Sequence, residues 1–208
     1  KKKSDLEAVC SNILRNVDQP RGLALYPTDG LLFYTAWGNN PHIGRAGMDG
    51  SHQKDIIYED IGMPNCIVVD VVLKRIYWSD AKYGRIETAE FNGHHRKTIF
   101  TQNVPHPFSL AIFEDTLYWS DWQKQQVQAC NKFDGDEHRI IFQEEELHGI
   151  IIYHHLLEVK HINPCLPKKC SHLCLSAYGG NSYTCVCPSS GEWHLAEDGV
   201  SCHVIHQS

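Results

Sequence analysis

Six of the nine cysteines fall in the last 44 residues, and their spacing is the clearest chemical signal in the chain. Cysteine thiolates bind zinc or form disulfides, and zinc sites usually contain paired Cys-x2-Cys knuckles, which this segment lacks. Six cysteines permit fifteen disulfide pairings. A segment this short needs bridges to fold, so the pattern predicts a disulfide framework and an oxidising compartment. Gaps of four, three, ten, one and fourteen residues separate Cys165, Cys170, Cys174, Cys185, Cys187 and Cys202.

Histidine is the second residue type that stands out, with fourteen copies in a chain of net charge −6. Imidazole titrates in the pH range between the cell surface and the endosome, and protonation of all fourteen would bring the net charge to +8. The pairs His94-His95 and His154-His155 are adjacent, so on strands their side chains point to opposite faces and do not readily chelate one metal ion. No serine elbow, Walker loop or His-Glu-x-x-His helix is present. The sequence therefore predicts a non-enzymatic protein with no metal, cofactor or nucleic-acid partner.

A repeat of about forty residues must position these side chains. Three copies follow one another, and each contains short apolar runs and one hairpin dipeptide such as Asn92-Gly93. Each copy supplies about four strands, the content of one β-propeller blade, so the expected fold class is all-β. Three landmark residues keep this period from copy to copy. The intervals are 44 and 43 residues for the prolines (Pro20, Pro64 and Pro107), 43 and 41 for the tyrosines (Tyr34, Tyr77 and Tyr118), and 43 and 42 for the closing glycines (Gly50, Gly93 and Gly135).

Two of the copies contain a four-residue motif that resembles the YWTD signature of the LDL-receptor superfamily. The motifs are Tyr77-Trp78-Ser79-Asp80 and Tyr118-Trp119-Ser120-Asp121, and Phe33-Tyr34-Thr35-Ala36 is a degenerate copy. The resemblance implies YWTD β-propeller blades over residues 1–160 and an EGF-like domain over residues 161–208. It also implies structural roles, in which the aromatic side chains pack between blades and the aspartates bind backbone, for Tyr34, Tyr77, Trp78, Asp80, Tyr118, Trp119 and Asp121.

Propellers of this superfamily have six blades, which at this period need roughly 250 residues. We expect about four blades here, namely three full repeats, part of one over residues 1–17, and a closing segment over residues 147–155. The first two blades or so would then lie upstream, because an incomplete ring leaves strand edges open. No run of 18 apolar residues occurs, so the expected membrane anchor is a segment outside this chain.

The cysteine spacing resembles that of EGF-like domains, which implies the pairs Cys165–Cys174, Cys170–Cys185 and Cys187–Cys202. Calcium-binding EGF modules have acidic residues before the first cysteine, whereas this chain has Asn163-Pro164, so no calcium is expected. The sequence leaves open whether the remaining cysteines are free and buried or pair with cysteines of other blades; these are Cys10, Cys66 and Cys130.

The resemblance also implies a surface that responds to pH. In the LDL receptor, exposed aromatic and histidine side chains on the top face of the propeller receive other modules of the same chain at acidic pH. Trp37 and His106 match two such positions, whereas Met63 and Gly84 replace a tryptophan and a second histidine. We expect protonation of His106 below about pH 6 to favour contact with acidic ligand-binding repeats and to displace cargo. The alternative is an imidazole that is simply hydrogen-bonded at the start of a strand.

The function expected from this resemblance is that of an endocytic receptor of the LDL-receptor-related or vitellogenin-receptor type. Its partners would be a protein or lipoprotein ligand and the cysteine-rich ligand-binding repeats of the same chain. It would act at the cell surface and in the endosome lumen, as the ectodomain of a membrane-anchored protein. Two alternatives are a direct ligand-binding propeller, as in Wnt co-receptors, and a matrix protein similar to nidogen.

Overall fold

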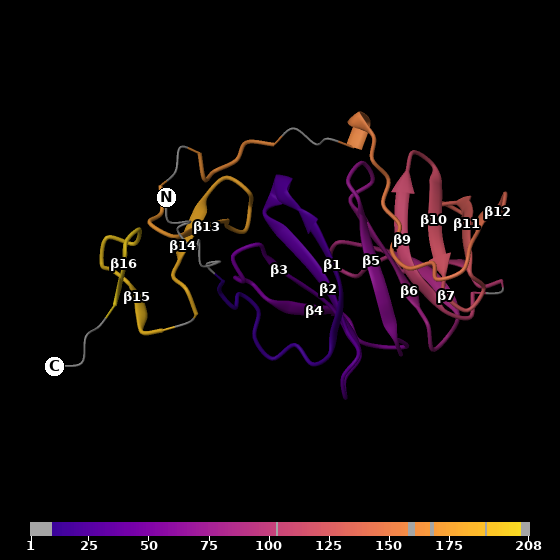
Figure 1. The fold of residues 1–208 in the computed structure, drawn as a ribbon, viewed down its shortest axis with the longest axis horizontal. Coiled ribbons are helices and arrows are strands. Elements are labelled where there is room, and N and C mark those ends of the chain that lie inside the picture. Colours follow the sequence, from indigo (N-terminus) through magenta and orange to yellow (C-terminus); the bar gives the residue numbers. More distant parts are fainter. Residues whose placement is uncertain (1–9, 103, 158–160, 167–168, 190, 205–208) are drawn as a thin grey trace, which may run out of the picture.

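The computed structural model describes residues 10–102, 104–157, 161–166, 169–189 and 191–204. It contains three four-stranded antiparallel sheets, followed by two small two-stranded sheets (Figure 1). We name the large sheets blades A, B and C. Blade A consists of β1 (Pro20–Tyr26), β2 (Leu31–Ala36), β3 (His42–Gly47) and β4 (Lys54–Ile57). Blade B consists of β5 (Pro64–Asp70), β6 (Arg75–Asp80), β7 (Arg85–Glu90) and β8 (Lys97–Phe100). Blade C consists of β9 (Pro107–Phe113), β10 (Thr116–Asp121), β11 (Gln126–Asn131) and β12 (Arg139–Gln143).

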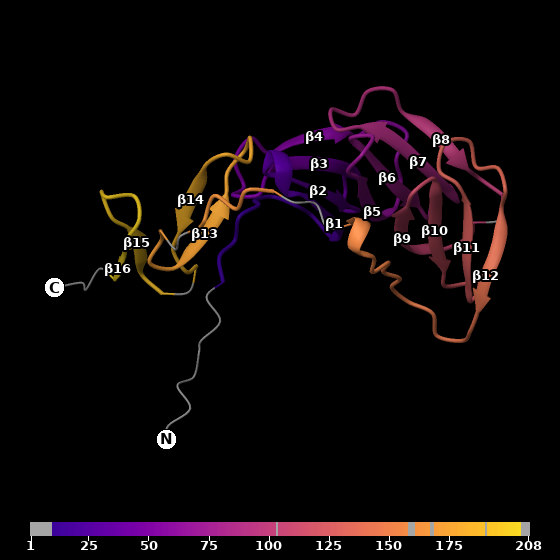
Figure 2. The same ribbon diagram turned by 90° about the horizontal axis from the view of Figure 1, so that it is seen from above.

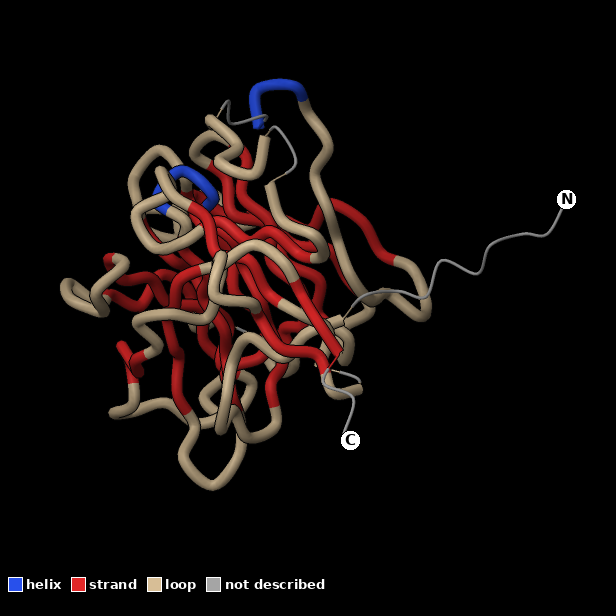
Figure 3. Tube along the Cα trace, turned by 90° about the vertical axis from the view of Figure 1, so that its left-hand side faces the viewer, coloured by secondary structure: helices blue, strands red, loops and turns tan. Residues whose placement is uncertain are grey.

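The strands of each blade pair in chain order, so every connection within a blade is a hairpin. The three sheets stand side by side and fan out from their first strands (Figure 2), where β1 contacts β5 and β5 contacts β9. Helical structure in the described residues is confined to two single 3-10 turns, Pro27–Asp29 and His155–Leu157 (Figure 3). The all-β architecture expected from the repeat is confirmed.

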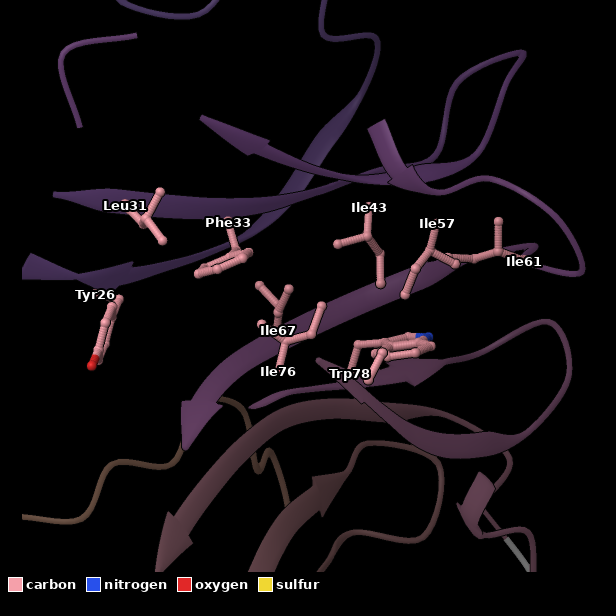
Figure 4. Packing of buried hydrophobic residues seen from close by; sticks show 10 residues of the cluster. Tyr26, Leu31, Phe33, Ile43, Ile57, Ile61, Ile67, Ile76 and Trp78 are labelled. Carbon is pink, nitrogen blue, oxygen red and sulfur yellow. The ribbon is translucent and has the colours of Figure 1, made fainter. Parts of the chain in front are cut away.

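Apolar side chains fill both junctions between blades because each sheet exposes two faces that only its neighbours can cover. Trp78 and Phe33 are fully buried between blades A and B, where Figure 4 shows them beside Ile43, Ile67 and neighbouring side chains. Leu117 and Trp119 are likewise fully buried between blades B and C. Trp78, Trp119 and Tyr77 of the motifs are therefore part of the core, whereas Tyr118 is only partly buried.

The register of the second strands shows how the degenerate motif aligns with the other two. Leu31, Arg75 and Thr116 each open the second strand of a blade. Phe33 therefore takes the place of the motif tyrosine, and Tyr34 takes the place of the motif tryptophan. Tyr34 is accordingly buried on the opposite face of blade A, beside Leu32 and Ala46, with Ile13, Leu14, Val17 and Met48 packed against it.

A close contact recurs wherever a hairpin meets the strand of the blade before it. Gly93 and Gly135 have φ of +88° and +81°, and a Cβ on either would collide with the carbonyl oxygen of Ile56 or Ile99, respectively. Gly50, with φ of +84°, makes the same approach to the carbonyl oxygen of Ile13. Residues around Ile13 therefore occupy the position of a preceding blade's outer strand, although residues 10–19 form no strand.

A similar equivalence holds on the side of blade C that faces away from blade B. Thr35 in blade A donates a hydrogen bond to the carbonyl oxygen of Asn65 in the next blade, and Ser120 donates one to that of His148. Residues around His148 therefore lie where the first strand of a further blade would begin. Of the roughly four blades expected, three are complete sheets, and the flanking parts are not paired into sheets because their partner strands are not in the described residues.

The C-terminal module, residues 161–166, 169–189 and 191–204, contains two small hairpins. Its disulfides are Cys165–Cys174, Cys170–Cys185 and Cys187–Cys202, the pairs that the resemblance implies. The expected domain boundary at 160 and 161 adjoins residues outside the described ranges and stays a prediction. The strands are β13 (Leu173–Ser176), β14 (Tyr183–Val186), β15 (Trp193–Leu195) and β16 (Cys202–Val204).

Blade A contacts this module through the turns at the ends of β1 and β3. The Gly179 amide donates to the carbonyl oxygen of Asp29 over 2.8 Å, and the Thr184 hydroxyl donates to Asp49 Oδ2 over 2.7 Å. The Tyr178 ring stacks on His52 with centroids 4.5 Å apart.

Removal of the Cys170–Cys185 bridge, by alanine at both positions, is expected to destabilise the module by about 3 kcal/mol. The reason is that the bridge restricts a loop with a sequence separation of 15 residues in the unfolded chain. Hydrogen exchange would show the loss as weaker protection of β13 and β14, with blade B unchanged. Cys10→Ala is the control because Cys10 is an exposed free thiol. Unchanged protection of β13 and β14 in the double variant would contradict the prediction.

Candidate ligand-binding site

A pocket lies where the first strands of the three blades begin, at the end of the blades opposite to the module contacts. Its cavity volume is about 280 Å³. It includes Trp37 and His106, two of the three residues singled out from the sequence. The complete lining is Arg21, Trp37, Asn65, His106, Phe108, Trp122 and His148.

Trp37 follows the last residue of β2 and is fixed by contacts on two sides. Its indole Nε1 donates a hydrogen bond to the carbonyl oxygen of Pro64 over 2.9 Å. The guanidinium of Arg21 lies over the ring, 3.8 Å from the centroid, in a cation–π contact. No carboxylate among the described residues forms an ion pair with Arg21, so its charge is available at the pocket.

His106 precedes β9 and is held by its backbone. Its amide donates to Asp121 Oδ2 over 3.1 Å, and its ring packs edge-on against Trp122 at a centroid distance of 5.4 Å. The imidazole Nδ1 is buried, and no hydrogen-bond partner for it is found among the described residues.

Met63 and Gly84, the other two positions considered from the sequence, do not line the pocket. The Met63 amide donates to Asp80 Oδ1, and its carbonyl oxygen accepts from Ala81. Its thioether side chain is partly exposed beside this turn. Gly84 adopts φ of +58° in the hairpin between β6 and β7. The contact proposed for Met63 is therefore outside the cavity that holds Trp37 and His106.

Several lining residues escaped the sequence interpretation. His148 lies against Phe108, with ring centroids 5.8 Å apart, and its Nδ1 is 2.6 Å from the carbonyl oxygen of Glu146. It supplies the pocket with a second imidazole, which the resemblance had led us to expect at position 84. Trp122 follows its four-residue motif as Trp37 follows the degenerate motif, and this equivalence could have identified it. His148 follows His106 by 42 residues, which is one repeat period, and this spacing could have identified it as the equivalent position of a further blade.

The lining contains one arginine, two histidines and no acidic side chain. Its three large aromatic side chains provide apolar area around these side chains. Aromatic and arginine side chains of this kind anchor protein interfaces. The pocket is therefore suited to a partner that presents a carboxylate beside an apolar group.

Other candidate centres have no comparable geometry. Within the described ranges, no group of three or more His, Cys, Asp or Glu side chains is placed to hold a metal ion, and no helix is long and apolar enough to span a membrane. Burial raises the pKa of the Cys66 thiol and raises that of Cys130 to about 12. Both thiols, like the exposed Cys10, are free of disulfides.

Comparison with known proteins identifies the repeats. The family model described as low-density lipoprotein receptor repeat class B matches residues 30–71 and 74–114, which span parts of all three blades. The chain carries class B (YWTD) repeats of the low-density lipoprotein receptor family. This family is non-enzymatic, in agreement with the sequence. The chain is similar to vitellogenin receptor Yl from Drosophila melanogaster, with 42% identity over 211 residues, 96% of this chain and 10% of that protein.

A second relative is the vitellogenin receptor of Solenopsis invicta, which is 34% identical over 179 residues, 86% of this chain and 10% of that protein. The chain thus spans about a tenth of the length of these two receptors. Among solved structures, a chain of the nidogen/laminin complex aligns with a TM-score of 0.57 and 30% identity, over 62% of this chain and 51% of that chain. The class B blades therefore have the YWTD propeller architecture.

Proposed function

We propose that this chain is part of the ectodomain of an endocytic lipoprotein-receptor protein, where the pocket of Trp37 and His106 makes an acid-dependent contact. The similarity to two vitellogenin receptors supports a protein or lipoprotein ligand. It equally supports action at the cell surface and in the endosome lumen. The C-terminal module would act as an EGF-like domain that accompanies the blades.

The observation that carries this proposal is the composition of the pocket. Arg21 stacks on Trp37, the Nδ1 of His106 has no hydrogen-bond partner among the described residues, and no acidic side chain lines the cavity. Cysteine-rich ligand-binding repeats of the same protein, which are acidic in this family, match this chemistry. A carboxylate of such a repeat would pair with Arg21 and accept a hydrogen bond from a protonated imidazole.

The pH dependence follows from the two imidazoles. Imidazole gains a positive charge as the pH falls through the range between the cell surface and the endosome. Protonation of His106 and His148 would add two positive charges to a pocket that already contains Arg21. Affinity for an acidic repeat therefore rises as the pH falls, and the repeat displaces cargo in the endosome.

The test is the affinity of purified acidic ligand-binding repeats for the intact ectodomain at pH 7.4 and pH 5.5. In the wild type we expect tighter binding at pH 5.5. In the variant with His106→Ala and His148→Ala, the acid-dependent gain should fall by about thirtyfold, since each of the two lost charges contributes on the order of 1 kcal/mol. Surface plasmon resonance would measure both dissociation constants.

His94→Ala is the matched control, because His94 is an exposed histidine outside the pocket. It should keep the wild-type gain. An equal gain in the double histidine variant would remove these residues from the mechanism. Binding by the wild type that is tight at pH 7.4 and does not change at pH 5.5 would instead support a matrix protein similar to nidogen, for which the structural similarity to a chain of the nidogen/laminin complex is the specific observation.

A further inference from the structure

A second groove lies between blades B and C at the end of the blades that faces away from the pocket of Trp37 and His106. It encloses about 350 Å³ between the start of β6, the hairpin before β8 and the hairpin before β12. Four of its side chains are basic and none is acidic. Its lining is Leu73, Arg75, Tyr77, Thr88, His95, Lys97, Ile99, Lys132 and Phe133.

Two of the four basic side chains are neutralised by nearby carboxylates. Lys132 Nζ lies 2.8 Å from Asp70 Oδ2 in a buried ion pair. His95 Nδ1 lies 2.7 Å from Glu90 Oε1 at the surface. These two residues therefore contribute little net charge to the groove.

Arg75 and Lys97 remain without a carboxylate partner among the described residues. Arg75 Nε donates to the Thr88 hydroxyl over 3.1 Å, and its Nη2 donates to the carbonyl oxygen of His95 over 2.8 Å. Lys97 Nζ donates to the carbonyl oxygen of Phe133 over 2.7 Å. Neutral acceptors thus hold both cations in place without cancelling their charge, which lowers the entropy cost of binding an anion.

The repeat itself does not require an arginine at this position. The equivalent residues that open the second strands of blades A and C are Leu31 and Thr116. If the fold needed an arginine here to bind the backbone, all three blades would have one at this position. Only blade B has it. Beside it, Leu73 and Phe133 are each about 40% exposed and form apolar walls.

We propose that this groove binds an acidic peptide segment of a protein partner, with its carboxylates on Arg75 and Lys97 and an apolar side chain between Leu73 and Phe133. A guanidinium forks to a carboxylate through two parallel hydrogen bonds, and apolar walls suit a peptide side chain. A sulfated glycan is the competing occupant, but it offers little apolar surface and needs a longer row of cations. The groove is independent of the pocket of Trp37 and His106.

The test is a titration of the intact ectodomain with a fluorescent peptide of alternating glutamate and leucine, followed by fluorescence anisotropy at two salt concentrations. We expect saturable binding that weakens with salt, because surface charge pairs are screened. Arg75→Gln combined with Lys97→Gln should weaken it at least tenfold. Lys97→Gln alone should weaken it about threefold, and it preserves the Arg75 bonds if the double variant folds poorly.

The matched control is Lys54→Gln, because Lys54 opens β4 as Lys97 opens β8 but does not line the groove. It should keep wild-type affinity. Equal affinity of Lys97→Gln and wild type would overturn the proposal. The proposal would also be overturned if the wild type bound a heparin decasaccharide but not the peptide, and if the Lys97→Gln variant lost this heparin binding. Loss of peptide binding in the His106 and His148 variant would also overturn it, since the peptide would then occupy the other pocket.

Discussion

Gly93→Ala is expected to lower the free energy of unfolding by about 3 kcal/mol or more, through separation of blades A and B. Gly93 has φ of +88°, and an added Cβ would collide with the carbonyl oxygen of Ile56 in the preceding blade. Backbone carbonyls do not yield as flexible side chains do, so blade B must move away from its neighbour. Thermal unfolding should show the loss as a fall in Tm of roughly 10 °C.

Gly179→Ala separates the cost of the backbone conformation from the cost of the collision. Gly179 has φ of +95°, but a Cβ there has no neighbour within 4 Å. Its substitution should cost only about 1 kcal/mol. Equal Tm values for the two variants would contradict the view that the close approach between blades requires glycine in these hairpins.

Asp80→Ala should produce the second large effect, a loss of about 4 kcal/mol in the free energy of unfolding. The fully buried Asp80 carboxylate accepts hydrogen bonds from four backbone amides. Two are those of Gly62 and Met63 at 2.7 and 3.0 Å, and two are those of Lys82 and Tyr83 at 2.9 and 3.2 Å. Alanine would leave these donors without an acceptor. Urea unfolding would measure the change.

Asp121→Ala provides a graded comparison at the equivalent position of blade C. Among the described residues, two backbone amides donate to Asp121, those of His106 and Lys124. Its substitution should therefore destabilise less than that of Asp80, by about 2 kcal/mol. It should also displace His106 and so weaken the acid-dependent contact. A larger loss at Asp121 than at Asp80 would contradict the view that these carboxylates act by satisfying backbone donors.

Most of the fold could be predicted because it depends on local patterns. Asn92-Gly93 and its counterparts fix hairpins through residues that tolerate positive φ, and a period of about forty residues fixes the blade. The alignment of the degenerate motif was less secure. The spacing of the tyrosines aligned Tyr34 with Tyr77, whereas the strand pairing aligns Tyr34 with Trp78. Strand register decides this alignment, because a shift of one residue moves each side chain to the other face of the sheet.

The candidate site could be predicted only in part. Trp37 and His106, which the resemblance placed on one face, line the same pocket, and Met63 does not line it. His148 lies one repeat period after His106, but the sequence interpretation assigned its segment only to the end of the propeller. Its place beside Phe108 follows from the hydrogen bond of Ser120 to its carbonyl oxygen, a contact across 28 residues of sequence.

The sequence by itself determined the four-strand unit, its repetition, the buried roles of Trp78 and Trp119, and a C-terminal cysteine framework, since each depends on residues that are near one another in the chain. Only the tertiary structure decided which side chains share a surface. Arg21 and His148 line one cavity, and Arg75 and Phe133 line another, because blades stack and bring the ends of distant strands together. The packing of whole sheets sets these neighbours, and no local spacing encodes it.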